Sequence, residues 1–194
     1  QGRNSGLFSE IIAACKQRGL AVAGADRLKV GAELAVRDIT AVLSFLALPE
    51  DDLSLAGALK SPIFGWSEQD LYDLAHKRPK GQYLSATLRE RASEFPKTRE
   101  ILDDLDRQAD FLRPYDLIER LLTRHDARDR LLGRLGTEAE DGINALLAQA
   151  LAYERSSIPS LTGFLEWMAA GELEIKRQMD NAGDQIRVMT VHGA

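Results

Sequence analysis

Cysteine and histidine are scarce in this sequence of 194 residues, and long apolar runs are missing. The single cysteine, Cys15, excludes a disulfide within the chain and fits a small core residue in a helical pattern. The three histidines, His76, His125 and His192, stand far apart, and no cysteine or histidine spacing is typical of a metal site. No apolar run approaches the ~20 residues of a membrane span, and no signal peptide is recognisable. We therefore expect no bound metal and a cytoplasmic location.

A glycine-rich phosphate loop is also missing. Gly57-Ala-Leu-Lys60-Ser61 contains the right residue types, but its glycine and lysine are not adjacent, so we interpret it as a helix end. The neighbouring carboxylates Asp51/Asp52 and Asp103/Asp104 do not face each other on a helix, which favours a cap and a solvated face over acid–base catalysis. His76 and His125 stand among charges near helix ends, which favours a solvated or dipole-related role. No self-contained active site is predicted.

The composition favours a helical globular protein. Hydrophobic residues make up 44% of the chain and charged residues 28%, with Leu, Ala, Glu, Asp and Arg abundant. The formal net charge is −5, which excludes attraction of nucleic acid to the whole surface because phosphate binding needs a concentrated basic face. A local basic patch remains compatible with this balance.

Periodic apolar residues predict long helices with few strands. Helices are expected over residues 7–18, 34–48, 138–154 and 161–170, with shorter ones between 83 and 135 that break at Pro96, Pro114 and Gly133. Asp51 or Asp52 is expected to cap one helix, and Ser67 with Asp70 forms a capping-box signature before another. Strands are expected at 20–23 and 185–194, and the polar stretch 172–184 is expected to be a linker.

The C-terminal strand predicts a larger parent protein. Ile186, Val188, Met189 and Val191 are apolar, as in a strand buried on both faces, and such a strand needs neighbours. Few other strand candidates exist, so we expect a piece of a larger α/β protein. The predicted fold class is mainly α, with a multi-helix insertion between short α/β segments.

Two segments could bind a ligand. Lys60-Ser-Pro-Ile-Phe-Gly-Trp66 is a turn before a capped helix, whose backbone N–H groups could seat a phosphate. The alternative is a plain turn between helices with Ile63, Phe64 and Trp66 in the core. The second segment is Met189–Ala194, because ligands of α/β folds bind at the carboxyl ends of strands. The alternative there is an ordinary strand and turn.

Three segments together resemble a known family. Ala23-Gly-Ala-Asp-Arg-Leu28, Lys60-Ser-Pro-Ile-Phe-Gly65 and Arg187-Val-Met-Thr-Val-His-Gly-Ala194 follow the order found in superfamily 1 helicases of the UvrD/Rep/RecB/AddA type. The sequences of these segments are most similar to AddA-type helicase–nuclease subunits of the alphaproteobacterial branch. The last segment resembles the start of helicase motif V. The resemblance extends along nearly the whole chain.

The resemblance implies a domain arrangement and candidate contacts. Residues 1–33 would be part of the RecA-like domain 2A, 34–184 a helical 2B-like insertion, and 185–194 the returning 2A strand. Arg3 would lie near a nucleotide-contacting arginine, although Asn4 competes for that position. DNA contacts would come from Thr190 and His192 in motif V. Further DNA contacts would come from the turn after the helix that Asp51 or Asp52 caps, at Lys60, Ser61, Gly65 and Trp66. Ser67 replaces the second glycine that relatives have in that turn.

The resemblance also implies what the parent protein does. It would be an ATP-dependent DNA helicase and exonuclease subunit in double-strand break repair, using ATP and Mg²⁺ and pairing with an AddB-like partner. This chain lacks the Walker A and B motifs, so we expect no ATPase activity from it alone. The other hypothesis is a helical protein-interaction module without direct DNA binding.

Overall fold

The computed structural model describes residues 34–76, 78–137 and 139–170 in full, together with the backbone of four short strands. The chain divides into two units. One comprises Gln1–Leu28 with Glu174–Ala194, and the other comprises Lys29–Leu173. The described residues are mainly helical, as predicted. That the units correspond to a RecA-like domain and a 2B-like insertion stays a prediction.

The first unit contains a parallel strand pair. Strands β1 (Val22–Ala23) and β4 (Ile186–Arg187) pair with Val22 opposite Ile186 and Ala23 opposite Arg187. Both lie inside the two segments predicted as strands. The chain thus leaves through one strand and returns, more than 160 residues later, beside it.

A second strand pair joins β2 (Arg27–Lys29) to β3 (Glu174–Lys176). The polar stretch 172–184 was predicted as a linker, and that prediction is wrong at Glu174–Lys176. The strand there pairs with residues far away in sequence, which local composition does not reveal. The predicted helix 7–18 and the remaining parts of both predicted strands lie outside the described residues.

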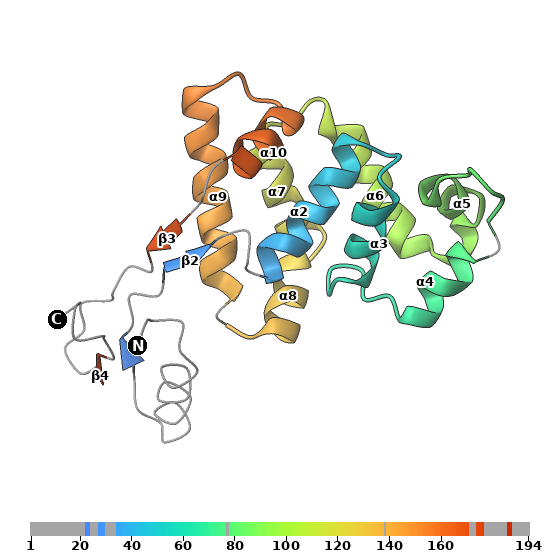
Figure 1. Ribbon diagram of the computed structural model, residues 1–194, viewed down its shortest axis with the longest axis horizontal. Coiled ribbons are helices and arrows are strands. Elements are labelled where there is room, and N and C mark those ends of the chain that lie inside the picture. The colour runs from blue at the N-terminus through green and yellow to red at the C-terminus, as the bar shows by residue number, and fades with distance from the viewer. Residues whose placement is uncertain are drawn as a thin grey trace. The chain divides into compact units, whose positions relative to one another are not determined.

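The helical unit is a succession of short and medium helices (Figure 1). In chain order they are α2 (Leu34–Ala47), α3 (Asp52–Lys60), α4 (Glu68–Ala75), α5 (Leu84–Glu90), η2 (Ala92–Glu94), α6 (Pro96–Ala109), α7 (Pro114–Glu119), η3 (Arg120–Arg124), α8 (Ala127–Leu135), α9 (Ala139–Ser156) and α10 (Leu161–Ala170). Pro96 and Pro114 begin helices, where a missing N–H costs nothing. The break predicted at Gly133 is wrong, because α8 continues through it and ends before Gly136, whose φ is +86°.

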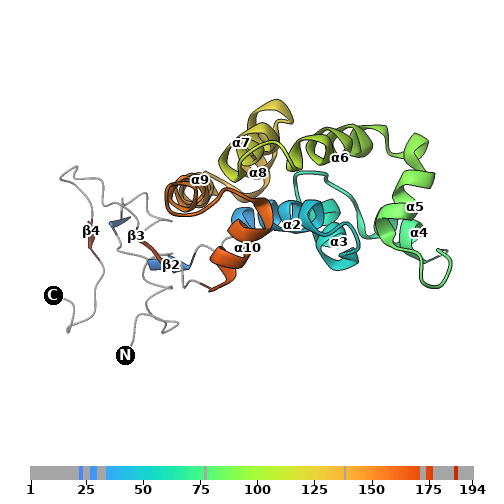
Figure 2. The ribbon, with the colours of Figure 1, turned by 90° about the horizontal axis from the view of Figure 1, so that it is seen from above.

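Helix α2 forms the centre of this unit. It packs against α3, α9 and α10, and its buried side chains include Ile39, Val42 and Leu43. Helices α9 and α10 lie towards one end, and α4 and α5 lie at the other (Figures 1 and 2). Each fully buried Leu or Ile contributes about 1.5–3 kcal/mol relative to exposure, so α2 holds the unit together chiefly by apolar burial.

Side-chain caps fix the starts of α3 and α4, the two helices joined by the Lys60–Trp66 turn. Asp51 accepts the Ser54 backbone N–H at 2.9 Å and thereby caps α3, as predicted. Ser67 accepts the Asp70 backbone N–H at 3.1 Å, and Asp70 accepts the Ser67 backbone N–H at 2.9 Å. The predicted capping box is therefore confirmed, with Asp in the position of the usual Glu.

Candidate nucleic-acid interface

Backbone hydrogen bonds define the turn between α3 and α4. The Trp66 N–H reaches back to the Leu59 carbonyl at 3.0 Å, and the Gly65 N–H donates to the Ser61 carbonyl at 2.8 Å. Gly65 has a φ of +69°, a left-handed conformation that glycine adopts without strain. The predicted Pro- and Gly-containing turn thus has a defined shape, which positions the side chains around it.

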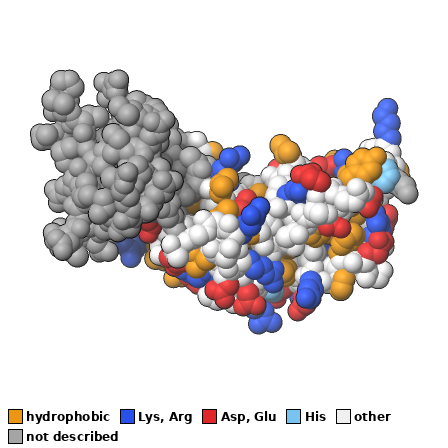
Figure 3. Space-filling model, turned by 90° about the horizontal axis from the view of Figure 1, so that it is seen from below, with side chains coloured by type: hydrophobic (Ala, Val, Ile, Leu, Met, Phe, Trp, Pro, Cys, Tyr) orange, Lys and Arg blue, Asp and Glu red, His pale blue; other side chains and the backbone are white. Residues whose placement is uncertain are grey.

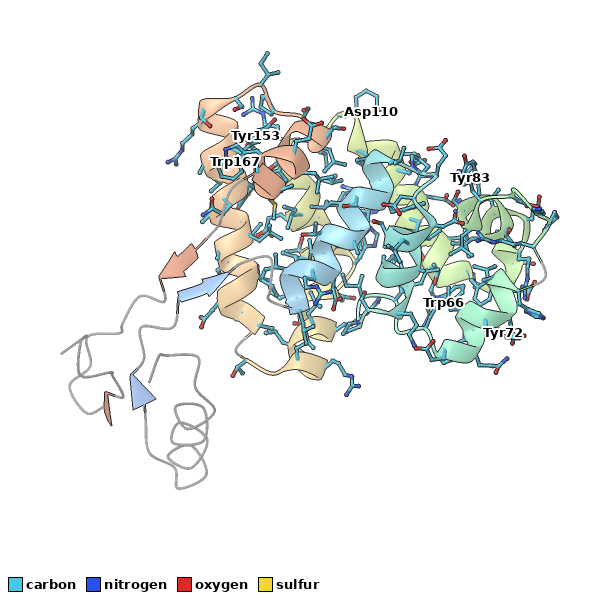
Figure 4. All side chains as sticks on the ribbon, viewed as in Figure 1. Trp66, Tyr72, Tyr83, Asp110, Tyr153 and Trp167 are labelled. Atoms are coloured by element: carbon cyan, nitrogen blue, oxygen red, sulfur yellow. The ribbon has the colours of Figure 1, made fainter. Side chains whose placement is uncertain are left out.

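Trp66 anchors this turn to α6. Its ring stacks on Phe95, with centroids 4.1 Å apart, and its indole Nε1 donates to Thr98 Oγ1 at 2.9 Å. The side chain enters the helical unit between α4 and α6 (Figure 4). Trp66 is only 8% exposed, which leaves no free ring face on which a base could stack. This placement favours the alternative interpretation, in which Trp66 belongs to the core.

Ser61 also has a structural role. It is buried, and its hydroxyl donates to the Ala58 carbonyl at 2.6 Å while accepting the Ile63 N–H at 3.3 Å. The first bond gives a partner to a carbonyl group near the end of α3, and the second fixes the backbone of the turn. The predicted contact residues Ser61 and Trp66 therefore shape the site, whereas Lys60 and Gly65 are nearer its surface.

A groove of about 540 Å³ opens beside the turn. Its lining comprises Lys60, Ser61, Pro62, Gly65, Trp66, Arg130, Gly133 and Arg134. Arg130 and Arg134 come from α8, one helical turn apart, so they face the groove from the side opposite the predicted turn. The groove thus brings Lys60 close to two arginines from a distant part of the sequence.

The three cations differ in how they are held. Arg130 Nη1 donates to the Ile63 carbonyl at 2.6 Å, which ties α8 to the turn. Lys60 Nζ lies 2.7 Å from Glu68 Oε1 at the start of α4. The Arg134 side chain is exposed and, within the described part of the chain, makes no ion pair or hydrogen bond. Arg134 is therefore the cation most available to a ligand.

The start of α4 itself is a poor phosphate seat. The capping box occupies the N–H groups of Ser67 and Asp70, and Glu68 and Asp70 place two carboxylates in the first turn. Hydrogen bonds from Ser67 hold the pKa of Asp70 below its ordinary value, so this carboxylate stays charged. The helix dipole is therefore already complemented by its own acids. Any phosphate here would be bound by the groove cations from α3 and α8.

Sequence reasoning missed Arg130 and Arg134. Their i, i+4 spacing with Gly133 between them was a usable signal of one cationic helix face. That this face meets the turn after α3 depends on tertiary packing. The other predicted site residues, Arg3, Thr190 and His192, lie outside the described residues and stay predictions.

A buried charge cluster lies between α6 and η3, away from this groove. Arg120 donates two hydrogen bonds of 2.7 Å to Asp104, and His125 Nε2 lies 2.7 Å from the same carboxylate. The paired Arg120 guanidinium holds the pKa of Asp104 well below its ordinary value. His125 is buried at the end of η3, which excludes a solvated role and leaves the dipole-related one, and the prediction of a solvated face is wrong for Asp104. The reason is a long-range partner that sequence neighbours do not reveal.

Charges of both signs are interspersed on the face shown in Figure 3. No continuous field of one sign covers the helical unit there. The mixed charges agree with the net charge of −5. An anion would therefore be attracted only by a local group of cations and not by the surface as a whole. Among the described residues, no group of three His, Cys, Asp or Glu side chains could hold a metal ion, and no helix is long and apolar enough to cross a membrane.

Comparison with known proteins gives a consistent result. No family model matches the chain. The ATP-dependent helicase/nuclease A subunit of Levilactobacillus brevis is 28% identical over 182 residues, which cover 82% of this chain and 14% of that protein. The protein of the same name from Lactobacillus delbrueckii subsp. bulgaricus is 26% identical over 175 residues, 81% of this chain and 14% of the relative.

The chain is similar to helicase/nuclease A subunits. A third such relative, from Geobacillus kaustophilus, is 25% identical over 181 residues, which cover 81% of this chain and 14% of that protein. The matches support the resemblance to AddA-type subunits that the three segments predicted. The chain spans about 14% of the length of these A subunits. The likeness to the alphaproteobacterial branch stays a prediction.

Proposed function

We propose that this chain is part of an AddA-like, ATP-dependent DNA helicase that acts in double-strand break repair and recombination. The similarity to A subunits along four fifths of the chain supports this proposal. The helical unit, which follows one strand of a parallel pair and precedes the other, supports its role as an insertion in a motor domain. The parent would use ATP and Mg²⁺ and would work with an AddB-like partner.

The helical unit guides duplex DNA through the groove beside the Lys60–Trp66 turn. The observation that carries this proposal is the convergence of Lys60, Arg130 and Arg134 on one groove in an otherwise acidic chain. Arginine forks and lysine ammonium groups bind phosphate oxygens through charge-assisted hydrogen bonds. The contacts go to the backbone and carry no base specificity.

The chain is not catalytic by itself. Its sequence contains no glycine-rich phosphate loop followed directly by Lys and Ser or Thr, so the residues present do not fit an ATP–Mg²⁺ site. No step of ATP hydrolysis is assigned to it. DNA-stimulated release of phosphate from ATP by the purified 194-residue chain would contradict this part of the proposal.

The second candidate function is a protein-interaction module without direct DNA contact. Strongly exposed apolar side chains occur at three places, namely Leu53 and Phe111 at 83% and Ile158 at 88%. Exposed apolar residues of this size are typical of contacts between subunits when they cluster. In the parent, both roles could belong to different faces of the same unit.

Salt-dependent binding of forked DNA separates the two functions. The 194-residue chain is titrated against labelled forked DNA at several salt concentrations between about 50 and 200 mM. Direct phosphate contact predicts a log–log slope of about −2 to −3, at about −0.9 for each neutralised phosphate. Weak binding with no salt slope would favour the interaction module.

A further inference from the structure

The cation of the groove that comes from α3 is held by a carboxylate from α4. Lys60 is the last residue of α3, Glu68 is the first of α4, and the intervening turn brings their charged atoms to 2.7 Å. The two side chains differ in how far they are exposed to solvent. The Glu68 side chain is 88% exposed, whereas the Lys60 side chain is 30% exposed against the groove wall.

Two carboxylates face Lys60, and only one of them can move away. The Lys60 charge also attracts the Asp70 carboxylate. However, Asp70 Oδ2 accepts hydrogen bonds from the Ser67 N–H and hydroxyl at 2.9 and 2.6 Å. Leaving these partners would uncap α4. Glu68 has no comparable bond within the described part of the chain, so it can turn into solvent without loss of helix structure.

We propose that Glu68 is an autoinhibitory contact that competes with a nucleic-acid phosphate for Lys60. In the resting groove, Arg134 and the free donors of Arg130 attract the phosphate backbone, and Lys60 joins them only when Glu68 is displaced. The groove therefore engages duplex DNA with two cations at first and three when the contact opens. This inference rests on the proposed function of the groove.

The strength of the contact suits such a switch. A Lys–Glu pair with an exposed carboxylate is weak and screened by salt, so little free energy is needed to open it. The helix dipole also retains Glu68 at the start of α4 after it leaves Lys60. Removing the Glu68 charge should make Lys60 permanently available.

The test compares the salt dependence of duplex DNA binding by the 194-residue chain and its E68Q variant. One more engaged cation steepens the log–log slope by about 0.9. Between about 200 and 50 mM salt, E68Q should then gain about threefold more affinity than the original chain gains. The matched control is D73N, which removes one negative charge from the exposed side of the same helix and should leave the slope unchanged.

Lys60 supplies the decisive comparison. If Glu68 acts through Lys60, the K60M/E68Q double variant has the slope of K60M, and the gain from E68Q disappears. Equal slopes for the original chain, E68Q and D73N, with clear binding in all three, would overturn the inference and leave the proposed function standing. No binding by either the original chain or E68Q would overturn both. Because the Glu68 side chain is exposed, E68Q should unfold at the same temperature as the original chain. This result would exclude misfolding as the cause of a changed slope.

Discussion

The indole Nε1 of Trp66 donates a hydrogen bond of 2.9 Å to the hydroxyl of Thr98, which lies 32 positions later in the chain. This bond, with the stacking of Trp66 on Phe95, joins the turn after α3 to the first turn of α6. The shape of the candidate groove therefore depends on a contact made inside the helical unit.

Substitutions at this pair should affect stability more than they affect charge. W66F keeps a ring against Phe95 but leaves the Thr98 hydroxyl unpaired, so we expect a loss of about 1–2 kcal/mol in the free energy of unfolding. W66A also opens a cavity and should cost about 3–5 kcal/mol. Urea unfolding measures both. If W66F/T98V is as unstable as the sum of the two single variants, the hydrogen bond does not couple them.

The Asp104 cluster should stabilise the contact between α6 and η3. D104N leaves the side chains of Arg120 and His125 without their charged partner, and we expect a loss of about 2 kcal/mol or more. The exposed carboxylate of Asp106, two positions along α6, is the matched control, and D106N should stay within about 0.5 kcal/mol. Similar losses in the two variants would show that the cluster contributes little.

Acid pH should weaken the same cluster. The folded-state pKa of Asp104 lies below its ordinary value of 3.8, so its contribution is complete at neutral pH and is lost as the pH falls below about 4. The unfolded state takes up this proton first, which is the sign expected for a lowered carboxylate pKa. Urea unfolding at a series of pH values from about 3 to 7 should show a smaller acid loss in D104N. An acid loss of equal size in the two proteins would contradict this assignment.

Asp38 on α2 should show the opposite pH dependence. Burial raises its pKa from 3.8 to about 6, against a smaller opposing effect of Arg37. The folded state therefore holds the proton more tightly, and this contribution to stability falls as the pH rises from about 4 to 6. Because the group is only half buried, D38N should gain about 1 kcal/mol at neutral pH, and little near pH ~4. Destabilisation by D38N at neutral pH would show that its charge is favourable.

The two glycines of the groove should respond in opposite directions to alanine. Gly65 has a φ of +69°, so G65A forces a left-handed conformation and should cost about 1–2 kcal/mol. Gly133 is helical, and a Cβ there would meet no atom within 4 Å, so G133A should stabilise α8 by up to about 1 kcal/mol. Thermal unfolding compares them directly. A loss of stability in G133A would mean that the glycine serves an unrecognised packing need.

Local features of the sequence predicted the helical unit well. The bounds of α2 and α10 and the capping box at Ser67 follow from apolar spacing and cap chemistry, which act within a few residues. The helix break predicted at Gly133 was wrong for an energetic reason. A glycine costs a helix about 1 kcal/mol, which is less than the gain from burying Leu131 on the same helix.

Long-range partners explain what sequence reasoning missed in the site. Trp66 had two open interpretations, and its contacts with Phe95 and Thr98 favour packing in the core. Asp104 and His125 each have the local pattern of surface residues, since nothing nearby in sequence indicates that Asp104 bonds both Arg120 and His125. Arg134 lines the groove only because α8 packs beside the turn after α3, and the sequence around Arg134 does not indicate this packing.

The central claim, that the groove binds nucleic-acid phosphates, is tested most directly at Arg134. R134Q removes a cation that holds no part of the described fold, and R155Q removes an equal charge from the far end of α9, whose 18 residues span about 27 Å. In a salt titration with forked DNA, R134Q should flatten the log–log slope by about 0.9 while R155Q leaves it unchanged. Equal slopes in the original chain and R134Q would contradict the claim.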